Sequence, residues 1–430
     1  MISSRLLLSI LACLALASPI FGTLQYGFPY GKQKIRGVSL GGWLLLQSFI
    51  TPGFFDRTDD LRIVDEYTYG QYRNKTIAQD ELKQHWDTFI TEQDFKDIAA
   101  AGLNHVRIPI GHWMFEVGPE DPYFQGQLPY LIKAVEWAKK HDLHIIVALY
   151  GAPASQNGFI NSGHFRDAAY WHKNQTNVDR TVNIMKTLTS MFEDQTDVVS
   201  IIQVMNEPAG FRKAILNPEL LEVLKGYYKS AYNFIRNPLN GKKKSNFMVL
   251  IHDAFQHLSY WNNFMPKDQY EGVMMDTHIY QMFNDHDAHM SYDDHIMRAC
   301  QNQTIMAASP MMTIIGEWTA TQNDCGPHLL GRFVGNRYDG SLPGTNRVGS
   351  CIGRTGKAST FSTEYKEFMR KYWEAQTQSY EKGGDGWVMW NWKMENADEW
   401  SYQAGLENGW IPQDPINYKY PDVCKSYTGL

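Results

Sequence analysis

The sequence lacks an excess of basic residues. Its 40 Lys and Arg are outnumbered by 46 Asp and Glu, which gives a formal net charge of -6. No basic field is present to attract a polyanion, so we expect no nucleic-acid partner. Low-complexity tracts and internal repeats are absent too, and 43% of the residues are hydrophobic, which excludes a disordered linker and favours a large folded core.

Hydrophobic runs long enough to cross a membrane are also missing. The apolar run LLLSILACLALA at residues 6–17 follows Arg5 and precedes a stretch of small residues, and it is too short for a bilayer span. We therefore predict a cleaved secretory signal over residues 1–22, with an approximate cleavage point, and a mature domain over 23–430. The expected product is secreted, extracellular or associated with the cell wall, and has no membrane partner.

Cysteines are few, and their number is informative. Of five, Cys13 lies in the predicted signal, and the remaining four allow three disulfide pairings. We favour Cys300 with Cys424 and Cys325 with Cys351, because the second pair would close a loop rich in Gly and Asn. No cysteine or histidine spacing of a metal site, no phosphate loop and no Rossmann fingerprint occurs, so we predict no metal and no cofactor.

Secretion gives meaning to three Asn-X-Thr sequons. They place predicted surface glycosylation at Asn74, Asn174 and Asn302. The sequence carries no dependable sign of oligomerisation, and we expect a monomer.

Short β-rich apolar runs recur along the chain with helical segments between them. We identify eight, at residues 35–41, 105–111, 144–151, 198–208, 247–255, 272–280, 312–318 and 386–393. Between the first two, Thr91 and Asp94 form a capping pair ahead of a short helix that stops at Gly102. Eight such units without a linker predict an α/β protein built as a single (β/α)₈ TIM barrel.

Polar residues cluster where several of these runs end. A barrel collects the carboxyl ends of its strands on one face, where the active sites of this architecture lie. The candidate residues are Arg107, Asn206, Glu207, His278, Tyr280, Glu317 and Trp392. Residues far apart in the sequence are therefore expected to meet.

Glu207 and Glu317 end two non-adjacent runs and would face each other across the barrel mouth. Glycoside cleavage uses such a pair, one carboxyl protonating the leaving oxygen and the other attacking the anomeric carbon. Asn206 would bond a sugar hydroxyl. Arg107 and Tyr280 would keep Glu317 ionised, Glu207 would need a raised pKa, and His278 could help to move protons. A separation above roughly 7 Å would argue against this mechanism.

Nearly the whole mature chain resembles the secreted fungal exo-β-1,3-glucanases of glycoside hydrolase family 5. The matching segments are RGVSLGGWLL (36–45), the stretch 85–113, GAPASQNGF (151–159), NEPAG (206–210), HDAF (252–255), THIYQMF (277–283), GEWTA (316–320) and WNWKMENADEWSY (390–402). The resemblance implies that Glu207 is the acid/base, that Glu317 is the nucleophile and that anomeric configuration is retained. It also implies that Phe159 and Phe283 grip the sugar at the pocket entrance.

Several positions depart from the family pattern. Ala148 and Tyr150 replace an expected acid and an expected histidine, Gln47 replaces a sugar-binding glutamate, and Ile160 replaces an aspartate. We keep Gln47 and Tyr150 as substrate-binding candidates and assign Trp43 and Trp390 to packing. The lost carboxylates would hold a terminal glucose less tightly, and apolar groups in their place could accept a substituted sugar or a flat aglycone.

The sequence thus predicts a retaining β-glycosidase that hydrolyses β-glucan or β-glucosides from the non-reducing end. One alternative is a rutinosidase-like diglycosidase that cleaves 6-O-substituted glucosides from flavonoids. A second is a carbohydrate-binding relative without turnover, for which Tyr150 is the main support.

Overall fold

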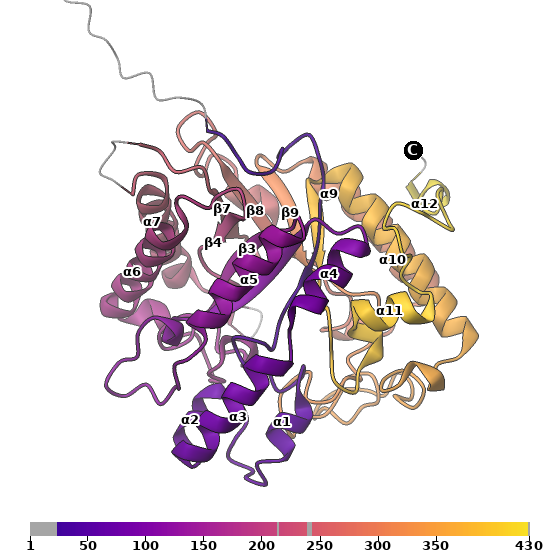
Figure 1. The fold of residues 1–430 in the computed structure, drawn as a ribbon. Helices are drawn as coiled ribbons and strands as arrows, with labels where there is room; N and C mark the ends of the chain where they lie inside the picture. Colours follow the sequence, from indigo (N-terminus) through magenta and orange to yellow (C-terminus); the bar gives the residue numbers. More distant parts are fainter. Residues whose placement is uncertain (1–23, 213–214, 239–242, 429–430) are drawn as a thin grey trace, which may run out of the picture.

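The protein is a closed barrel of eight parallel strands surrounded by helices, seen here in a computed structural model that describes residues 24–212, 215–238 and 243–428 (Figure 1). The strands follow the order β1-β10-β9-β8-β7-β4-β3-β2 around the barrel. Their bounds are β1 Ile35–Ser39, β2 His105–Gly111, β3 His144–Gly151, β4 Val199–Gln203, β7 Met248–His252, β8 Val273–His278, β9 Met312–Glu317 and β10 Gly386–Met389. The predicted TIM barrel is confirmed, and each predicted run contains one of these strands.

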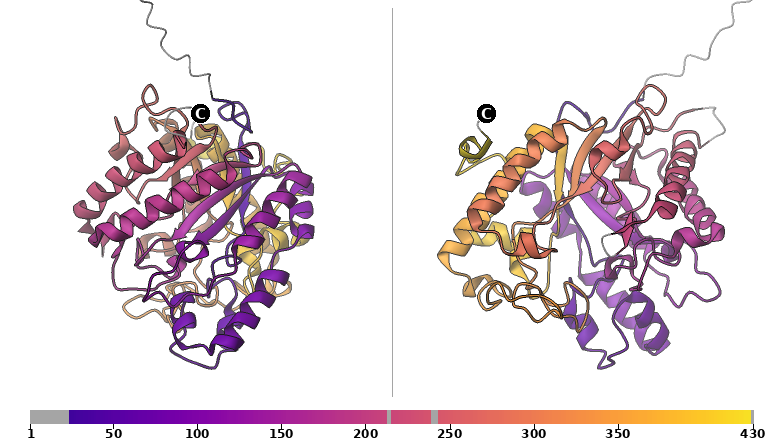
Figure 2. Two further views of the ribbon diagram at one scale, coloured as in Figure 1. Left: turned by 60° about the vertical axis from the view of Figure 1, so that its left-hand side comes forward. Right: turned by 180° about the vertical axis from the view of Figure 1, so that it is seen from behind.

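Helices between the strands cover the outside of the barrel, and neighbouring helices such as α6 and α7, or α9 and α10, lie side by side (Figure 2). The longer ones are α3 Lys75–Thr88, α4 Glu92–Ala100, α5 Leu128–Lys140, α6 Gln175–Phe192, α7 Pro218–Arg236, α9 Tyr292–Ala307 and α10 Thr363–Gly383. The shorter ones are α1 Pro52–Asp56, α2 Glu66–Tyr72, α8 Asp285–Ala288, α11 Tyr402–Asn408 and α12 Lys425–Thr428. Thr91 and Asp94 form the predicted capping box of α4.

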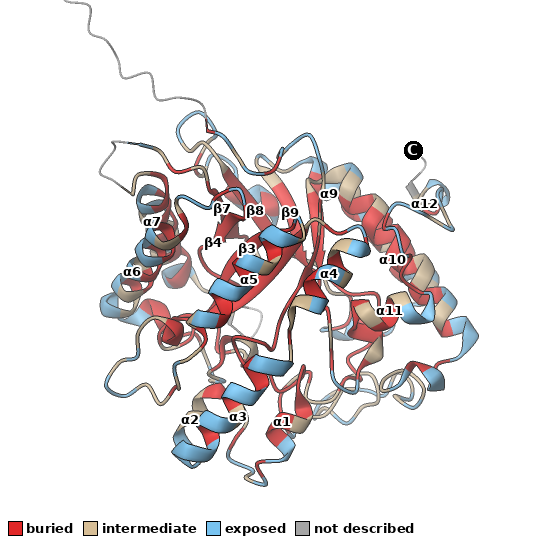
Figure 3. Ribbon diagram, in the orientation of Figure 1, coloured by how far each residue is buried: buried red, intermediate tan, exposed pale blue. Residues whose placement is uncertain are grey.

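Apolar side chains fill two layers. The larger lies between the strands and the helices, whose outward faces are exposed while the strands are buried (Figure 3). The smaller lies inside the barrel, where Ile146, Ile201 and Met274 from different strands meet Phe28. Strand residues alternate between these layers, Ile145 facing the helices and Ile146 the interior. Because apolar side chains fill the interior of the barrel, the polar groups lie at its mouth, where the carboxyl ends of the strands meet.

Both predicted disulfides are present. Cys300 of α9 bonds Cys424 near the end of the described chain, and Cys325 bonds Cys351. The second bond closes a loop within the long irregular segment between β9 and α10. Disulfides of this kind persist in oxidising compartments, which fits an extracellular protein.

Two of the three sequon asparagines are exposed, as predicted. Asn74 and Asn174 are exposed, and each caps a helix through its side-chain oxygen, on α3 and α6 respectively. Asn302 is different, because it lies within α9 with its side chain buried. The predicted surface site at Asn302 is therefore wrong, since a glycan cannot be attached there without opening the helix packing.

The predicted signal at residues 1–22 lies outside the described residues. Over the part of the chain that is described, every helix is too short or too polar to span a bilayer.

Glu399 gives the fold a testable pH dependence. It is fully buried, and burial raises its pKa from 4.5 to about 8. The hydroxyl of Thr355 acts in the opposite direction, because a hydrogen bond to the carboxylate lowers the pKa. The folded state therefore keeps a proton that the unfolded chain loses above about pH 4.5, so this contribution to stability is present in acid and is lost as the pH rises through about 8.

We expect Glu399→Gln to remove this dependence, because the amide has a similar shape and does not ionise. Thermal unfolding at pH 5 and pH 8 should show the variant gaining a few degrees over the wild type at pH 8 but not at pH 5. An equal difference between the two proteins at both pH values would contradict the raised pKa.

Candidate active site

Arg107 organises the mouth of the barrel. It lies on β2 with its side chain fully buried, and its guanidinium reaches groups from four other strands or their ends. Nη2 donates to Asn206 Oδ1 at 2.8 Å and to Asp276 Oδ2 at 3.2 Å, and Nε donates to Gln203 Oε1 at 2.8 Å. Nη1 donates to Glu317 Oε1 at 2.8 Å. A buried cation needs such partners, so the network holds these side chains in one arrangement.

The Glu317 carboxylate, at the end of β9, accepts hydrogen bonds on both oxygens. Oε1 accepts from Arg107 and from the hydroxyl of Tyr150, and Oε2 accepts from the hydroxyl of Tyr280 at 2.8 Å. Arg107 also donates to the Tyr150 hydroxyl and lies over its ring. The sequence placed Arg107 and Tyr280 beside Glu317, and the structure brings both there.

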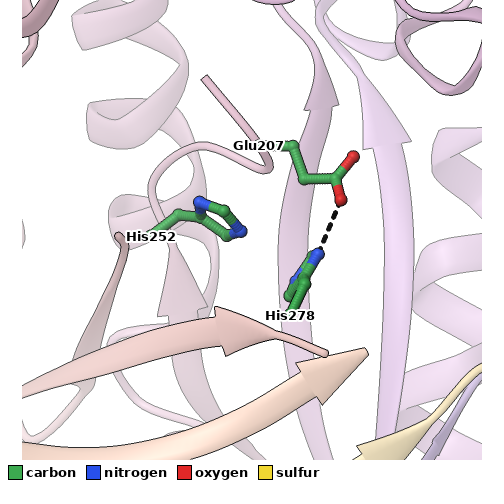
Figure 4. Close-up of side chains that lie close together, drawn as sticks. All are labelled: Glu207, His252 and His278. Carbon is green, nitrogen blue, oxygen red and sulfur yellow. Dashed lines mark hydrogen bonds and ion pairs between the residues drawn. The ribbon is translucent and has the colours of Figure 1, made fainter. Parts of the chain in front are cut away.

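Glu207 follows β4 and adopts a left-handed backbone conformation, with φ of 46°. Such a conformation is uncommon for a residue with a side chain, and its cost is characteristic of functional sites. Glu207 Oε1 lies 2.7 Å from Nδ1 of His278, the contact drawn in Figure 4, and Oε2 accepts from Asn161 Nδ2 at 2.5 Å. The carboxyl group is therefore fixed between a histidine and an amide.

His278 lies between the two glutamates. Its Nδ1 is 2.7 Å from Glu207 Oε1 and 3.7 Å from Glu317 Oε2. The sum of these distances, 6.4 Å, is the upper limit for the separation of the two carboxylate oxygens. This limit lies below the range of about 6.5–9.5 Å that is typical of inverting glycosidases and is compatible with retention.

The protonation of these groups differs from the sequence expectation. Burial would lower the pKa of His278, but the carboxylates of Glu317 and Asp276 and the bond to Glu207 raise it to about 10. Burial favours a higher pKa for Glu207, yet cationic His278 outweighs it and holds that pKa below its usual value. Burial raises the pKa of Glu317 against the charges of His278 and Arg107. In the unliganded site the proton needed for acid catalysis is thus held on His278.

Glu207, His252 and His278 also form a cluster whose ligand atoms lie within 4.8 Å of one another (Figure 4). Burial lowers the pKa of His252 to about 3, so its ring is neutral, and its Nδ1 accepts from the backbone N–H of Ala254. The proton of that neutral ring is therefore on Nε2. Both ring nitrogens of His278 pair with carboxylates, Nδ1 with Glu207 and Nε2 with Asp276, so the cluster has the arrangement of a proton-carrying network.

A cavity of about 440 Å³ opens above the two glutamates. Its polar groups include Glu207, Glu317, His278, Tyr280 and Asn161, and the rest of its wall is apolar. The apolar lining residues are Phe49, Phe159, Ile160, Phe165, Phe211, Phe255, Phe283, Leu329, Leu330, Trp390 and Trp400. The predicted entrance residues Phe159 and Phe283 both line the cavity.

Trp392 does not lie in this cavity, contrary to the sequence prediction. Its side chain is fully buried in the core, stacked on Tyr402, and its Nε1 donates to Asp94 Oδ1 at 3.0 Å. Trp390 lines the cavity instead and stacks on Tyr150, with ring centroids 5.7 Å apart. The assignment of Trp390 to packing is nevertheless confirmed, since its side chain is buried in an apolar cluster, and Trp43 is fully buried in the core as predicted.

Four other predicted positions lie behind the cavity wall. Gln47 is fully buried, and its amide atoms have no hydrogen-bond partner among the residues described. Gln47 does not line the cavity, and its contact with substrate stays a prediction. Arg107, Asn206 and Tyr150 are also fully buried. Arg107 and Tyr150 donate to Glu317 Oε1, and Asn206 accepts from Arg107.

Three residues of the site were missed by sequence reasoning. Asp276 accepts from Arg107 and contacts His278 Nε2 at 3.1 Å, and Gln203 donates to Asp276 Oδ2 at 2.7 Å. Asp276 and Gln203 lie on strands, where every second side chain points to the same side of the sheet. Asp276 is two residues before His278, so this alternation could have indicated it. Asn161, which bonds Glu207, lies in an irregular segment that carried no such signal.

Comparisons with known proteins agree with this site. The sequence profile described as Cellulase (glycosyl hydrolase family 5) matches residues 71–331. A glucan 1,3-beta-glucosidase of Blumeria graminis is 39% identical over 419 residues, covering 96% of this chain and 95% of that protein. A probable glucan 1,3-beta-glucosidase A of Aspergillus terreus is 41% identical over 400 residues, covering 92% of each.

A solved structure shares the fold at low sequence identity. The rutinosidase from Aspergillus niger superposes with a TM-score of 0.70 at 17% identity, covering 90% of this chain and 99% of that one.

The barrel, the paired glutamates and these similarities define an O-glycosyl hydrolase whose substrate is a carbohydrate. The chain belongs to glycosyl hydrolase family 5, as the resemblance of its motifs implied, and like that family it is a retaining enzyme.

Proposed function

We propose that the protein is an exo-acting β-1,3-glucosidase that removes glucose from the non-reducing end of β-1,3-glucan. The observation that carries this proposal is the Glu207–His278 pair facing Glu317 beneath a single cavity. The linkage rests on the relatives of similar length that are named for glucan 1,3-β-glucosidase activity. We also propose that the enzyme is secreted as a monomer, with residues 1–22 as its signal.

In the first step, a Glu317 oxygen forms a bond to the anomeric carbon while the glycosidic C–O bond breaks. Oε1 is occupied by Arg107 and Tyr150, whereas Oε2 has one donor, Tyr280, and faces His278. We assign the attack to Oε2, because its lone pairs are less engaged. The leaving oxygen takes a proton from Glu207, and the products are a covalent glucosyl-enzyme and the shortened glucan.

The proton for this step starts on His278 Nδ1, 2.7 Å from Glu207 Oε1. Glu317 is the strongest of the charges that raise the pKa of His278. As the nucleophile bonds to carbon its negative charge disappears, so His278 loses that support and passes its proton to Glu207. Attack and leaving-group protonation are thereby coupled through one histidine.

In the second step, Glu207 as a carboxylate takes a proton from water, whose oxygen attacks the anomeric carbon and releases Glu317. Two inversions give net retention. Asn206 supports both steps from behind the cavity wall, because its Oδ1 accepts from Arg107 and so helps to hold the guanidinium that donates to Glu317.

One observation favours a second candidate function. Ile160 lines the cavity where the family pattern has an acid, and most of the remaining wall is apolar. A 6-O-substituted glucoside with a flat flavonoid aglycone, the substrate of a rutinosidase, would suit such a wall better than a free terminal glucose.

Product analysis with the purified protein tests both candidates. We expect wild type to release glucose from laminarin, with the β-anomer appearing first by NMR, and Glu317→Gln to release none. Intact rutinose from rutin with little laminarin turnover would replace the proposal by the second candidate. Wild type that behaves like Glu317→Gln on both substrates would overturn the enzymatic proposal and favour a binding protein.

A further inference from the structure

His252 is a buried histidine beside the Glu207–His278 pair. It is the last residue of β7 and is fully buried. Its ring meets that of His278 edge to face, with the ring centroids 4.4 Å apart and an angle of 86° between the two planes. Figure 4 shows the outer edge of the His252 ring, with its nitrogen, pointing at His278.

The backbone and the inner edge of His252 are fixed by hydrogen bonds. The hydroxyl of Tyr228, on α7, donates to the carbonyl oxygen of His252 at 2.8 Å and accepts from its N–H at 3.2 Å. Nδ1 accepts from the N–H of Ala254 at 3.0 Å, so the neutral ring carries its proton on Nε2. The turn that supplies this N–H is strained, because Ala254 has a φ of 53°. These contacts keep Nε2–H directed at His278.

The Nε2–H group of His252 has no hydrogen-bond partner among the described residues. A buried donor without a partner costs free energy, whereas a phenylalanine ring would fill the same space without that cost. Packing alone therefore does not account for a histidine at this position. The face of a neutral aromatic ring attracts an N–H group, but the face of a charged imidazolium repels it.

Three carboxylates hold the proton on His278. Its Nδ1 lies 2.7 Å from Glu207 Oε1 and 3.7 Å from Glu317 Oε2, and its Nε2 lies 3.1 Å from Asp276 Oδ2. These charges stabilise the imidazolium and so oppose the transfer of its proton. The charge of Glu317 is lost when this residue bonds to the anomeric carbon, but Asp276 stays ionised, because its pKa is lowered to about 2.

Two positive groups act against the charge of His278. Arg107 is a cation that shares Asp276 and Glu317 with it, and the guanidinium is engaged with both carboxylates. The second is the N–H dipole of His252, whose positive end meets the imidazolium face. This repulsion ends when the proton moves from His278 Nδ1 to Glu207 Oε1, because the N–H then meets the face of a neutral ring.

We propose that His252 is a positioning residue that acts through His278 to favour transfer of the acid proton to Glu207. From Glu207 the proton passes to the leaving oxygen as the glycosidic C–O bond breaks, and His252 itself gains and loses no bond. This rests on the proposed function, because it assumes that Glu207 is the acid/base. The effect of His252 should therefore appear only where the leaving group needs a proton.

The test compares kcat/KM for laminaripentaose, whose leaving group needs a proton, with kcat/KM for 2,4-dinitrophenyl β-glucoside, whose leaving group does not. In His252→Phe, which keeps a ring but removes the N–H, kcat/KM should fall about tenfold for the pentaose and less than about twofold for the aryl glucoside. His252→Gln places an amide N–H near the position of Nε2. Its ratio of the two kcat/KM values should lie closer to that of the wild type.

A double variant tests whether His252 acts through the acid/base. When Glu207→Ala has already removed the route of the proton, adding His252→Phe should cause no further fall in kcat/KM for the pentaose. A further tenfold fall in the double variant would show that His252 acts independently of Glu207 and would overturn the proposal.

The matched control is His105→Phe. His105 is equally buried and lies beside another histidine, His144, but it begins β2 and so lies at the end of the barrel opposite the mouth. Its ratio of kcat/KM values should equal that of the wild type.

Equal falls on both substrates in His252→Phe would indicate a purely structural role and overturn the proposal, as would an unchanged ratio in the folded variant. A ratio for His252→Gln no higher than that for His252→Phe would also overturn it. If His252→Phe does not fold, His252→Leu replaces it with the same expected ratio. Failure of the wild type to hydrolyse any laminarioligosaccharide would instead overturn the proposed function.

Discussion

Glu317→Gly should lose about five orders of magnitude in kcat, and azide should restore turnover with α-glucosyl azide as the product. The Glu317 carboxylate supplies the oxygen that bonds the anomeric carbon, so glycine removes the nucleophile and leaves a space beside Arg107 and Tyr280. Azide in this space attacks the β-glucoside once, which inverts the configuration. The measurement uses 2,4-dinitrophenyl β-glucoside and identifies the product by NMR.

The matched control is Glu317→Gln, in which the amide occupies the same space and should block azide. Both variants should bind substrate, because Glu207, His278 and the cavity wall are unchanged. A β-configured azide, or rescue of the glutamine variant, would contradict the assignment of Glu317 as nucleophile. Circular dichroism of each variant confirms that the barrel is intact, which matters because Glu317 is also a partner of buried Arg107.

Glu207→Ala should show a loss that depends on the leaving group. A glucosyl leaving group needs protonation, so kcat/KM on laminarioligosaccharides should fall about 10³-fold to 10⁴-fold. The 2,4-dinitrophenolate leaves without a proton, so kcat/KM for its glucoside should change by less than about tenfold. Azide should attack the accumulated glucosyl-enzyme and give β-glucosyl azide, the opposite configuration to the product expected from Glu317→Gly.

The control for this prediction is Asn161→Ala. Asn161 donates to Glu207 Oε2 but holds no transferable proton. The fall in kcat/KM of Asn161→Ala should therefore be much smaller than that of Glu207→Ala, and it should again be larger for laminarioligosaccharides than for the aryl glucoside. Equal losses on both substrates in Glu207→Ala would contradict the acid/base role. The α-configured azide would exchange the roles of the two glutamates.

The strands could be read from the sequence because each is a short apolar run of β-forming residues that ends in polar ones. The least accurate boundary was β4, which was expected to reach residue 208 but ends at Gln203. The physical reason is local, since Glu207 takes a left-handed conformation that extended strand geometry does not permit. The α4 boundaries were read correctly because the Thr91–Asp94 pair is a local signal.

The site was predictable as far as it depends on the strand ends. Glu207, Glu317, Arg107 and His278 came together because a closed barrel brings the ends of its strands to one mouth. Trp390 and Trp392 could not be told apart, since β10 ends at Met389 and the alternation of sides that would separate them stops there. Which indole faces the cavity depends on tertiary packing around Asp94.

The contributions of irregular segments were out of reach. Asn161 lies in the 3-10 helix Ile160–Ser162 after β3, and this single turn is too short for a repeating pattern in the sequence to show which way its side chain points. The burial of Asn302 was hidden for another reason, because a sequon specifies only a short local pattern and carries no information about which face of α9 packs inward.

The contacts of Arg107 tie activity to the integrity of the barrel. One side chain on β2 holds groups on β4, β8 and β9, together with Tyr150 on β3, and all of them are buried. If β8 or β9 detaches, a buried charge loses its partner, and if β3 or β4 detaches, buried hydrogen bonds to Arg107 are lost. An intermediate with part of the barrel open therefore cannot keep the two glutamates in position. A catalytic assay therefore serves as a probe of native folding, and heat inactivation should coincide with loss of the barrel.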